Sequence, residues 1–102
     1  MQQWVHLCAV KDAPAPGEVT EEEAGGVSVC LANVEGTLHA LDNVCPHRQG
    51  PLSEGWLEGG AVLCPWHAWA FDLKTGEAAA EGSRVAVYPV RSAGDLVEIE
   101  LP

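Results

Sequence analysis

The chain has 102 residues, and its 5 lysines and arginines against 15 aspartates and glutamates give a formal net charge of −10. This length favours one domain with its own hydrophobic core, and we expect a single monomeric domain over residues 1–102. The acidic balance excludes the basic footprint that binding to nucleic acid or to an anionic membrane needs. No apolar run reaches the roughly 18 residues of a membrane span, so the sequence predicts a soluble protein.

The N-terminus, Met1-Gln2-Gln3-Trp4-Val5, has neither the basic nor the apolar region of a secretion signal. We therefore expect a cytoplasmic protein. In that reducing compartment the four cysteines are expected to be metal ligands or buried thiols rather than disulfides.

Short apolar stretches recur between turn signals and predict an all-β protein with little helix. In chain order, the expected strands are residues 5–10, 27–34, 37–41, 61–63, 85–90 and 96–101. The sequences Glu35-Gly36 and Ala93-Gly94-Asp95 predict hairpin turns, and therefore antiparallel neighbours. The glutamate-rich segment 14–26 is expected to be a solvated loop or sheet edge rather than a docking patch.

Between residues 43 and 78, Gly, Pro, Trp, Cys and His concentrate and the expected strands are short. We expect a loop-rich insertion on the β framework there. Two of its segments, Cys45-Pro46-His47 and Cys64-Pro65-Trp66-His67, each hold one thiol and one imidazole, and sixteen residues separate them. The pattern C-x-H-x16-C-x2-H places four metal-ligand side chains next to turn-forming residues, so it predicts a metal centre.

The mixture of ligand types narrows the choice of metal. A structural zinc finger usually groups two cysteines and then two histidines, on a hairpin and a helix. Here each segment supplies one of each, and no helix is predicted. A cluster with two different irons, one bound by thiolates and the other by imidazoles, explains the mixture. A zinc-stabilised interaction module without redox function stays open as an alternative.

These segments resemble the Rieske [2Fe–2S] proteins, and most closely their soluble ferredoxin branch. The resemblance is carried by CPHRQGPLSEG at 45–55 and CPWHAWAFDLKTG at 64–76, and extends more weakly over nearly the whole chain. It implies one [2Fe–2S] cluster per chain, with Cys45 and Cys64 on one iron and His47 and His67 on the other. It also implies the Rieske fold, an antiparallel β-sandwich of three sheets, with a cluster-binding subdomain at about 43–78.

The chain departs from the high-potential members of that family. Those members have a disulfide between the cluster loops, and a serine and a tyrosine after the second histidine. The corresponding positions here are Gly50, Trp66, Trp69 and Phe71, so the loop disulfide and both hydroxyls are missing. We therefore expect a reduction potential near the low end of the roughly −150 to +300 mV span of Rieske centres.

The other cysteines and histidines lie in expected strands outside the insertion. We interpret Cys8 and Cys30 as buried thiols, and His6 and His39 as structural residues, rather than as ligands. Trp4 is expected to anchor the core.

The resemblance implies a one-electron carrier rather than an enzyme, which takes electrons from a flavin-dependent reductase and passes them to a terminal oxygenase. An oxygenase itself would need a mononuclear iron on a second domain, for which the length leaves no room. The alternative is the small subunit of an assimilatory NAD(P)H nitrite reductase, partnered by the large subunit. We expect the partner to contact His47 and His67 together with Arg48, Pro51 and Trp66.

Overall fold

The computed structural model describes residues 3–44, 51–64, 70–78 and 84–101. Its strands are β1 (Gln3–Ala9), β2 (Val19–Ala24), β3 (Val27–Val34), β4 (Thr37–Asp42), β5 (Trp56–Glu58), β6 (Ala61–Leu63), β7 (Ala70–Asp72), β8 (Val87–Tyr88), β9 (Val90–Ala93) and β10 (Leu96–Leu101). Two short 3₁₀ helices, η1 (Val10–Asp12) and η2 (Leu52–Glu54), accompany them. The expected all-β class is confirmed. No helix in the described ranges is long and apolar enough to cross a membrane.

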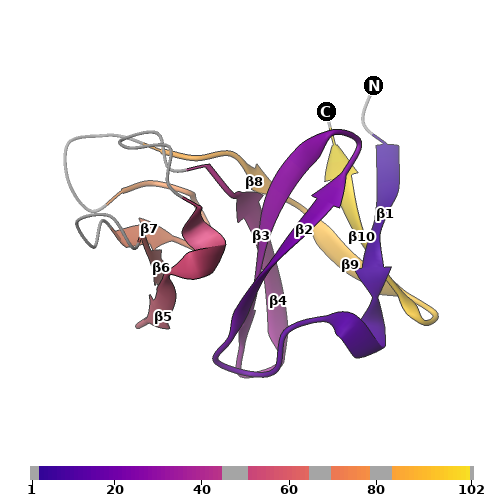
Figure 1. Cartoon of the computed structure of the whole chain (residues 1–102), viewed down its shortest axis with the longest axis horizontal. Coiled ribbons are helices and arrows are strands. Elements are labelled where there is room, and N and C mark those ends of the chain that lie inside the picture. Colours follow the sequence, from indigo (N-terminus) through magenta and orange to yellow (C-terminus); the bar gives the residue numbers. More distant parts are fainter. Residues whose placement is uncertain (1–2, 45–50, 65–69, 79–83, 102) are drawn as a thin grey trace.

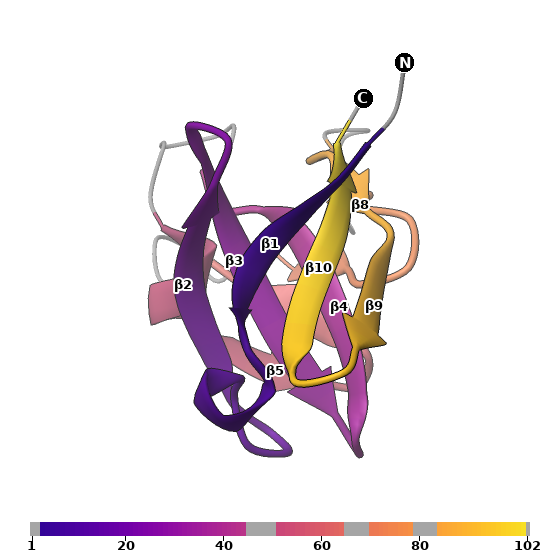
Figure 2. The same cartoon turned by 90° about the vertical axis from the view of Figure 1, so that its right-hand side faces the viewer.

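The strands form three antiparallel sheets with the orders β1-β10-β9, β2-β3-β4-β8 and β5-β6-β7. Figure 1 shows the four-stranded sheet between the other two, with the small β5-β6-β7 sheet on its left. Turned by 90°, Figure 2 shows β1, β10 and β9 lying across the front of the four-stranded sheet. The expected three-sheet antiparallel sandwich is therefore confirmed.

Strand β3 is central to the packing because both of its faces are buried. Successive side chains of a strand point to opposite faces. Val29 and Leu31 therefore enter one hydrophobic cluster, which also contains Ile99 of β10. Cys30 and Ala32 enter a second cluster, which lies toward the β5-β6-β7 sheet. The four-stranded sheet thus contributes to two cores, one on each face.

The two predicted hairpin turns are confirmed. Glu35 and Gly36, between β3 and β4, have φ values of 53° and 93°, as a tight turn of the type that suits twisted antiparallel strands requires. Gly94, between β9 and β10, has a φ of 62°.

The expected strand at 85–90 is divided in two. Pro89 separates β8, which belongs to the four-stranded sheet, from β9, which belongs to the sheet with β1 and β10. Proline has no backbone N–H for a ladder hydrogen bond, and its carbonyl instead accepts from the N–H of Glu100 (2.9 Å). One predicted strand therefore links two sheets.

The segment 14–26 contains a strand that the sequence did not predict as such. Residues 19–24 form β2, which pairs with β3 over its whole length and lies at the edge of its sheet. The expectation of a sheet edge is confirmed, and the expectation of a loop was wrong for this part.

The expectation that Trp4 anchors the core was wrong. Trp4 is half-buried on β1 and belongs to neither core cluster. Its ring lies under the guanidinium of Arg91, whose central carbon is 4.0 Å from the ring centroid. Arg91 Nε also donates to Glu98 Oε1 (2.9 Å), so Trp4 is part of a surface stack.

Candidate metal centre

Only part of the predicted site lies within the described residues. Cys64 and Pro51 lie within them, whereas Cys45, His47, His67, Arg48, Trp66 and Trp69 lie outside. The described residues do, however, define where each predicted ligand segment begins and ends.

The residues that flank the first ligand segment are paired with each other. Val44 and Pro51 form an antiparallel bridge, and the N–H of Leu52 donates to the carbonyl of Asn43 (2.7 Å). Pro51 is half-buried, whereas Val44 is 45% exposed. Residues 45–50 are therefore closed at their base by backbone pairing.

Asn43 holds this base to the four-stranded sheet. Its side chain is buried, and Nδ2 donates to Ser28 Oγ (3.1 Å) while Oδ1 accepts from the N–H of Ser53 (2.8 Å). Its backbone N–H also donates to the carbonyl of Ser28 (3.0 Å). From the sequence, Asn43 marks only the boundary of the insertion, and this function is not predicted. The one local signal is an asparagine directly after a strand, where such side chains often bind nearby backbone.

The second ligand segment connects two paired strands. Leu63 of β6 and Ala70 of β7 are register partners, so residues 64–69 leave and rejoin the sheet at one place. Cys64 directly follows β6 and is fully buried. A Cβ added to Gly55 would lie 1.7 Å from the carbonyl oxygen of Leu63. The chain that leaves the first segment therefore packs closely against the end of β6, which only glycine permits.

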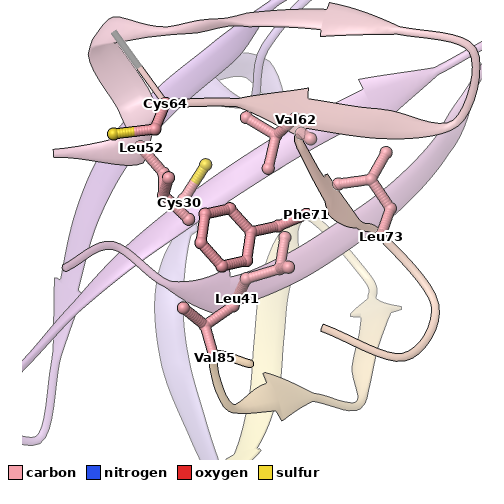
Figure 3. Close-up of a cluster of buried hydrophobic side chains, with 9 residues drawn as sticks. Cys30, Leu41, Leu52, Val62, Cys64, Phe71, Leu73 and Val85 are labelled. Atoms are coloured by element: carbon pink, nitrogen blue, oxygen red, sulfur yellow. The ribbon is translucent and has the colours of Figure 1, made fainter. Parts of the chain in front are cut away.

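The bases of these segments meet in one hydrophobic cluster. It contains Leu52, which comes after the first segment, and Cys64 and Phe71 on either side of the second. It also contains Val85, which follows residues 79–83, and Figure 3 shows these side chains packed together. The structure thus brings together the ends of both predicted ligand segments, although they are far apart in sequence.

A tight turn after β7 fixes the other side of this cluster. Asp72 Oδ1 accepts from the N–H of Lys74 (2.7 Å) and of Thr75 (3.1 Å), and these hydrogen bonds lower the pKa of Asp72. Gly76 follows with a φ of 78°, and a Cβ there would lie 2.1 Å from the carbonyl oxygen of Val85. The turn therefore needs glycine at this position.

The two cysteines outside the insertion are buried thiols, as predicted. Burial raises the pKa of Cys8 to about 11, with help from the charges of Glu22 and Asp12. Burial alone raises the pKa of Cys30 to about 12. Neither is a thiolate at neutral pH, which is the form that binds metals.

His6 is exposed on β1 and His39 is half-buried on β4. Burial, followed by the charge of Lys74, lowers the pKa of His39. Within the described ranges no three metal-binding side chains come together, and the structural role of both histidines stays a prediction.

Comparison with known proteins assigns the family. Residues 3–90 match the model of the Rieske [2Fe-2S] domain. The chain is 35% identical over 102 residues to the ferredoxin component of a naphthalene 1,2-dioxygenase system from Pseudomonas aeruginosa, covering 98% of this chain and 97% of that protein.

Two solved structures are close to this fold. A ferredoxin of Sphingomonas yanoikuyae B1 superimposes with a TM-score of 0.86 at 28% identity, over 98% of this chain and 100% of its own. A Mycobacterium tuberculosis structure, described as the small subunit of an NADH-dependent nitrite reductase, gives a TM-score of 0.88 at 26% identity, over 100% and 97% of the two chains. The family match and the full-length relative both show that the chain belongs to the Rieske [2Fe–2S] family.

Proposed function

We propose that this chain is a Rieske ferredoxin, a one-electron carrier that takes electrons from a flavin-dependent reductase and delivers them to a terminal oxygenase. One observation carries the proposal: the chain aligns over almost its full length with the ferredoxin component of a dioxygenase system. That relative is itself an electron-transfer component and not the oxygenase, so we assign no catalytic residues to this chain.

The proposed site holds one [2Fe–2S] cluster, with Cys45 and Cys64 on one iron and His47 and His67 on the other. Two thiols and two imidazoles are the donor set of a Rieske centre. The position of Cys64 supports its role, because it directly follows β6 where the second ligand segment leaves the sheet. When bound, the cluster accepts and returns a single electron. The backbone pairing at both segment bases would orient the ligands.

The chemical composition of the purified protein tests this site. We expect two irons and two acid-labile sulfides per chain, and uptake of one electron on reduction. His47→Ala and His67→Ala should each abolish the visible absorption, whereas the control His6→Ala, at an exposed position on β1, should keep it. A colourless protein with one zinc would refute the cluster and support the zinc-stabilised module.

The second candidate is the small subunit of a nitrite reductase, which the likeness to the Mycobacterium tuberculosis structure favours. An electron-transfer assay with each kind of partner distinguishes the ferredoxin from the nitrite reductase subunit. The reduced protein should be reoxidised during turnover of a Rieske oxygenase, and not by the large subunit of an NAD(P)H nitrite reductase. The reverse result would select the second candidate.

We propose that the partner contacts His47 and His67 together with Arg48, Pro51 and Trp66. Electron transfer needs a short distance between the cluster and the partner, and a cation in an otherwise acidic surface would help to orient the complex. Arg48→Glu should slow reduction by the partner more than Lys11→Glu, which makes the same charge change on η1. Equal rates for both variants would exclude this surface.

The proposed reduction potential is near the low end of the range for Rieske centres, about −150 mV. The reasons are that Trp69 and Phe71 supply no hydroxyl, that the loop disulfide is missing, and that the chain has a net charge of −10. At alkaline pH the potential should fall by up to about 59 mV per pH unit where one proton accompanies the electron. Voltammetry from neutral to alkaline pH tests both points. A neutral-pH potential near the top of the span would contradict the argument.

We further propose that residues 1–102 work as one cytoplasmic, monomeric domain with its cluster-binding subdomain at 43–78. The sheet β5-β6-β7 lies wholly within that range, which supports the boundary. Cys8 and Cys30 are free cysteines, which is in keeping with a reducing compartment. Cell fractionation and sedimentation should find the protein in the cytoplasm and at about 11 kDa, close to its 10.8 kDa chain mass.

A further inference from the structure

A continuous chain of hydrogen bonds runs from the protein surface to the base of the first ligand segment. Ser28 Oγ donates to Glu21 Oε2 (2.9 Å) and accepts from Asn43 Nδ2 (3.1 Å). Asn43 Oδ1 in turn accepts from the N–H of Ser53 (2.8 Å). This series of hydrogen bonds therefore links β2, β3, the end of β4 and η2.

The groups at the two ends of this series, the Glu21 carboxylate and the Ser53 N–H, fix the direction of every hydrogen bond in it. The N–H of Ser53 can only donate, so the oxygen of the Asn43 amide must face it, and the amide nitrogen must face Ser28. A carboxylate can only accept, so the Ser28 hydroxyl donates its one hydrogen to Glu21 and is left to accept from Asn43. Each group has one role, so the amide has a single favourable orientation.

Asn43 also joins the two ends of the first ligand segment. Its carbonyl accepts from Leu52 and its side chain accepts from Ser53, both of which come after the segment. On the other side, Asn43 lies two residues before Cys45. A buried residue that stands at the entry of a short segment and is hydrogen-bonded to its exit restricts how the two ends can move relative to each other.

We propose that Asn43 is a positioning residue for the first ligand pair: its side-chain amide sets the geometry in which Cys45 and His47 meet the cluster. This inference rests on the ligand set of the proposed function. Groups that hold metal ligands in place tune the metal centre, and their loss typically weakens metal binding 10- to 100-fold.

The chain contains a well-matched control, the second buried asparagine, Asn33. Its Nδ2 donates to the carbonyl of Pro14 (2.9 Å) and its Oδ1 accepts from the N–H of Gly36 (2.8 Å). Its amide therefore also donates one hydrogen bond and accepts one from a backbone N–H, but at the β3–β4 hairpin instead of at a ligand segment. Truncation of either asparagine removes two side-chain hydrogen bonds that are buried or partly buried, so the loss of stability alone should be similar.

The experiment compares Asn43→Ala and Asn33→Ala in the cluster-loaded protein. Asn43→Ala should shift the electron paramagnetic resonance g values and the midpoint potential, and should lose iron to a chelator about 10-fold faster. Asn33→Ala should match the wild type in all three measurements while melting at a similarly lowered temperature. If both variants shift equally, or if neither shifts, Asn43 is only structural and the inference is wrong.

Ser28 provides the second test if Asn43→Ala retains no iron. Ser28→Ala removes the acceptor of Asn43 Nδ2 but leaves the bond to Ser53, so the g values should move in the same direction by a smaller amount. Ser28→Thr keeps the hydroxyl and should restore them. A Ser28→Ala spectrum identical to that of the wild type would overturn the inference. Absence of a cluster in the wild-type protein would instead refute the proposed function.

Discussion

Gly55→Ala tests the close packing between the exit of the first ligand segment and the end of β6. The added Cβ would lie 1.7 Å from the carbonyl oxygen of Leu63, 2.9 Å from its carbonyl carbon and 3.2 Å from the carbonyl oxygen of Leu52. Relief to an ordinary contact of about 3.5 Å needs a movement of roughly 2 Å. All three neighbouring atoms belong to the backbone, so no side-chain rotation can supply it.

The expected cost is therefore at or above the top of the range for overpacking, about 3 kcal/mol. For a domain of this size that lowers the melting temperature by about 12–24 °C. Circular dichroism during heating measures the loss, and visible absorption followed in parallel shows whether the cluster is released in the same transition.

Gly59→Ala is the control for this prediction. Gly59 has a φ of 57° and no atom within 4 Å of the added Cβ, so this variant has backbone strain of about 1–2 kcal/mol but no collision. Gly55 has an ordinary φ of −86°, so its variant has the collision but little backbone strain. The reasoning would be refuted if Gly55→Ala melted within a few degrees of the wild type, or no lower than Gly59→Ala.

Three further predictions concern pH and surface contacts. The raised pKa of Cys30, about 12, stabilises the fold below pH 9, and this contribution is lost as pH rises from 9 toward 12, by up to about 4 kcal/mol; denaturant titrations should show no such loss in Cys30→Ala. The lowered pKa of Asp72 stabilises the fold above about pH 4, and this contribution is lost as pH falls further. Asp72→Asn can still accept the turn hydrogen bonds, so its free energy of unfolding should fall less steeply below pH 4 than that of the wild type. Arg91→Ala should lower the free energy of unfolding by about 1 kcal/mol, because it removes both the contact with the Trp4 ring and the ion pair with Glu98. Glu98→Gln removes the ion pair but leaves Arg91 on the Trp4 ring, so it should lower the free energy of unfolding by about 0.5 kcal/mol or less. Equal losses in the two variants would contradict a contribution from the ring contact.

The sequence predicted the fold class and the chemistry of the site more fully than the packing. Ligand types are visible as residue identities, so Cys45, His47, Cys64 and His67 could be proposed before any contact was known. Which parts of the fold hold these residues could not be predicted from the sequence. The close approach of Gly55 to Leu63, for example, follows from the pairing of Trp56 with Leu63 between β5 and β6, and β5 was not among the predicted strands.

Local strand preference also failed where tertiary pairing decides the structure. Residues 19–24 contain three consecutive glutamates, which disfavour strands, yet they pair in full register with β3. The adjacent turn at Gly25 and Gly26, with φ values of 57° and 80°, returns the chain directly onto its neighbour. Within 43–78, β6 was predicted because its three residues are all apolar, whereas the equally short β5 and β7 each contain an acidic residue, which disfavours strands, and were missed.

The glutamates of β2 have a consequence for the behaviour of many copies in solution. β2 ends its sheet, and an open strand edge is a template on which another chain can add a strand and begin an aggregate. Glu21 and Glu23 project into water along this edge, so a second copy that approached it would meet two like charges at once. A carrier that works by repeated brief collisions must stay dispersed at high concentration, and charge repulsion between the glutamates of β2 favours this.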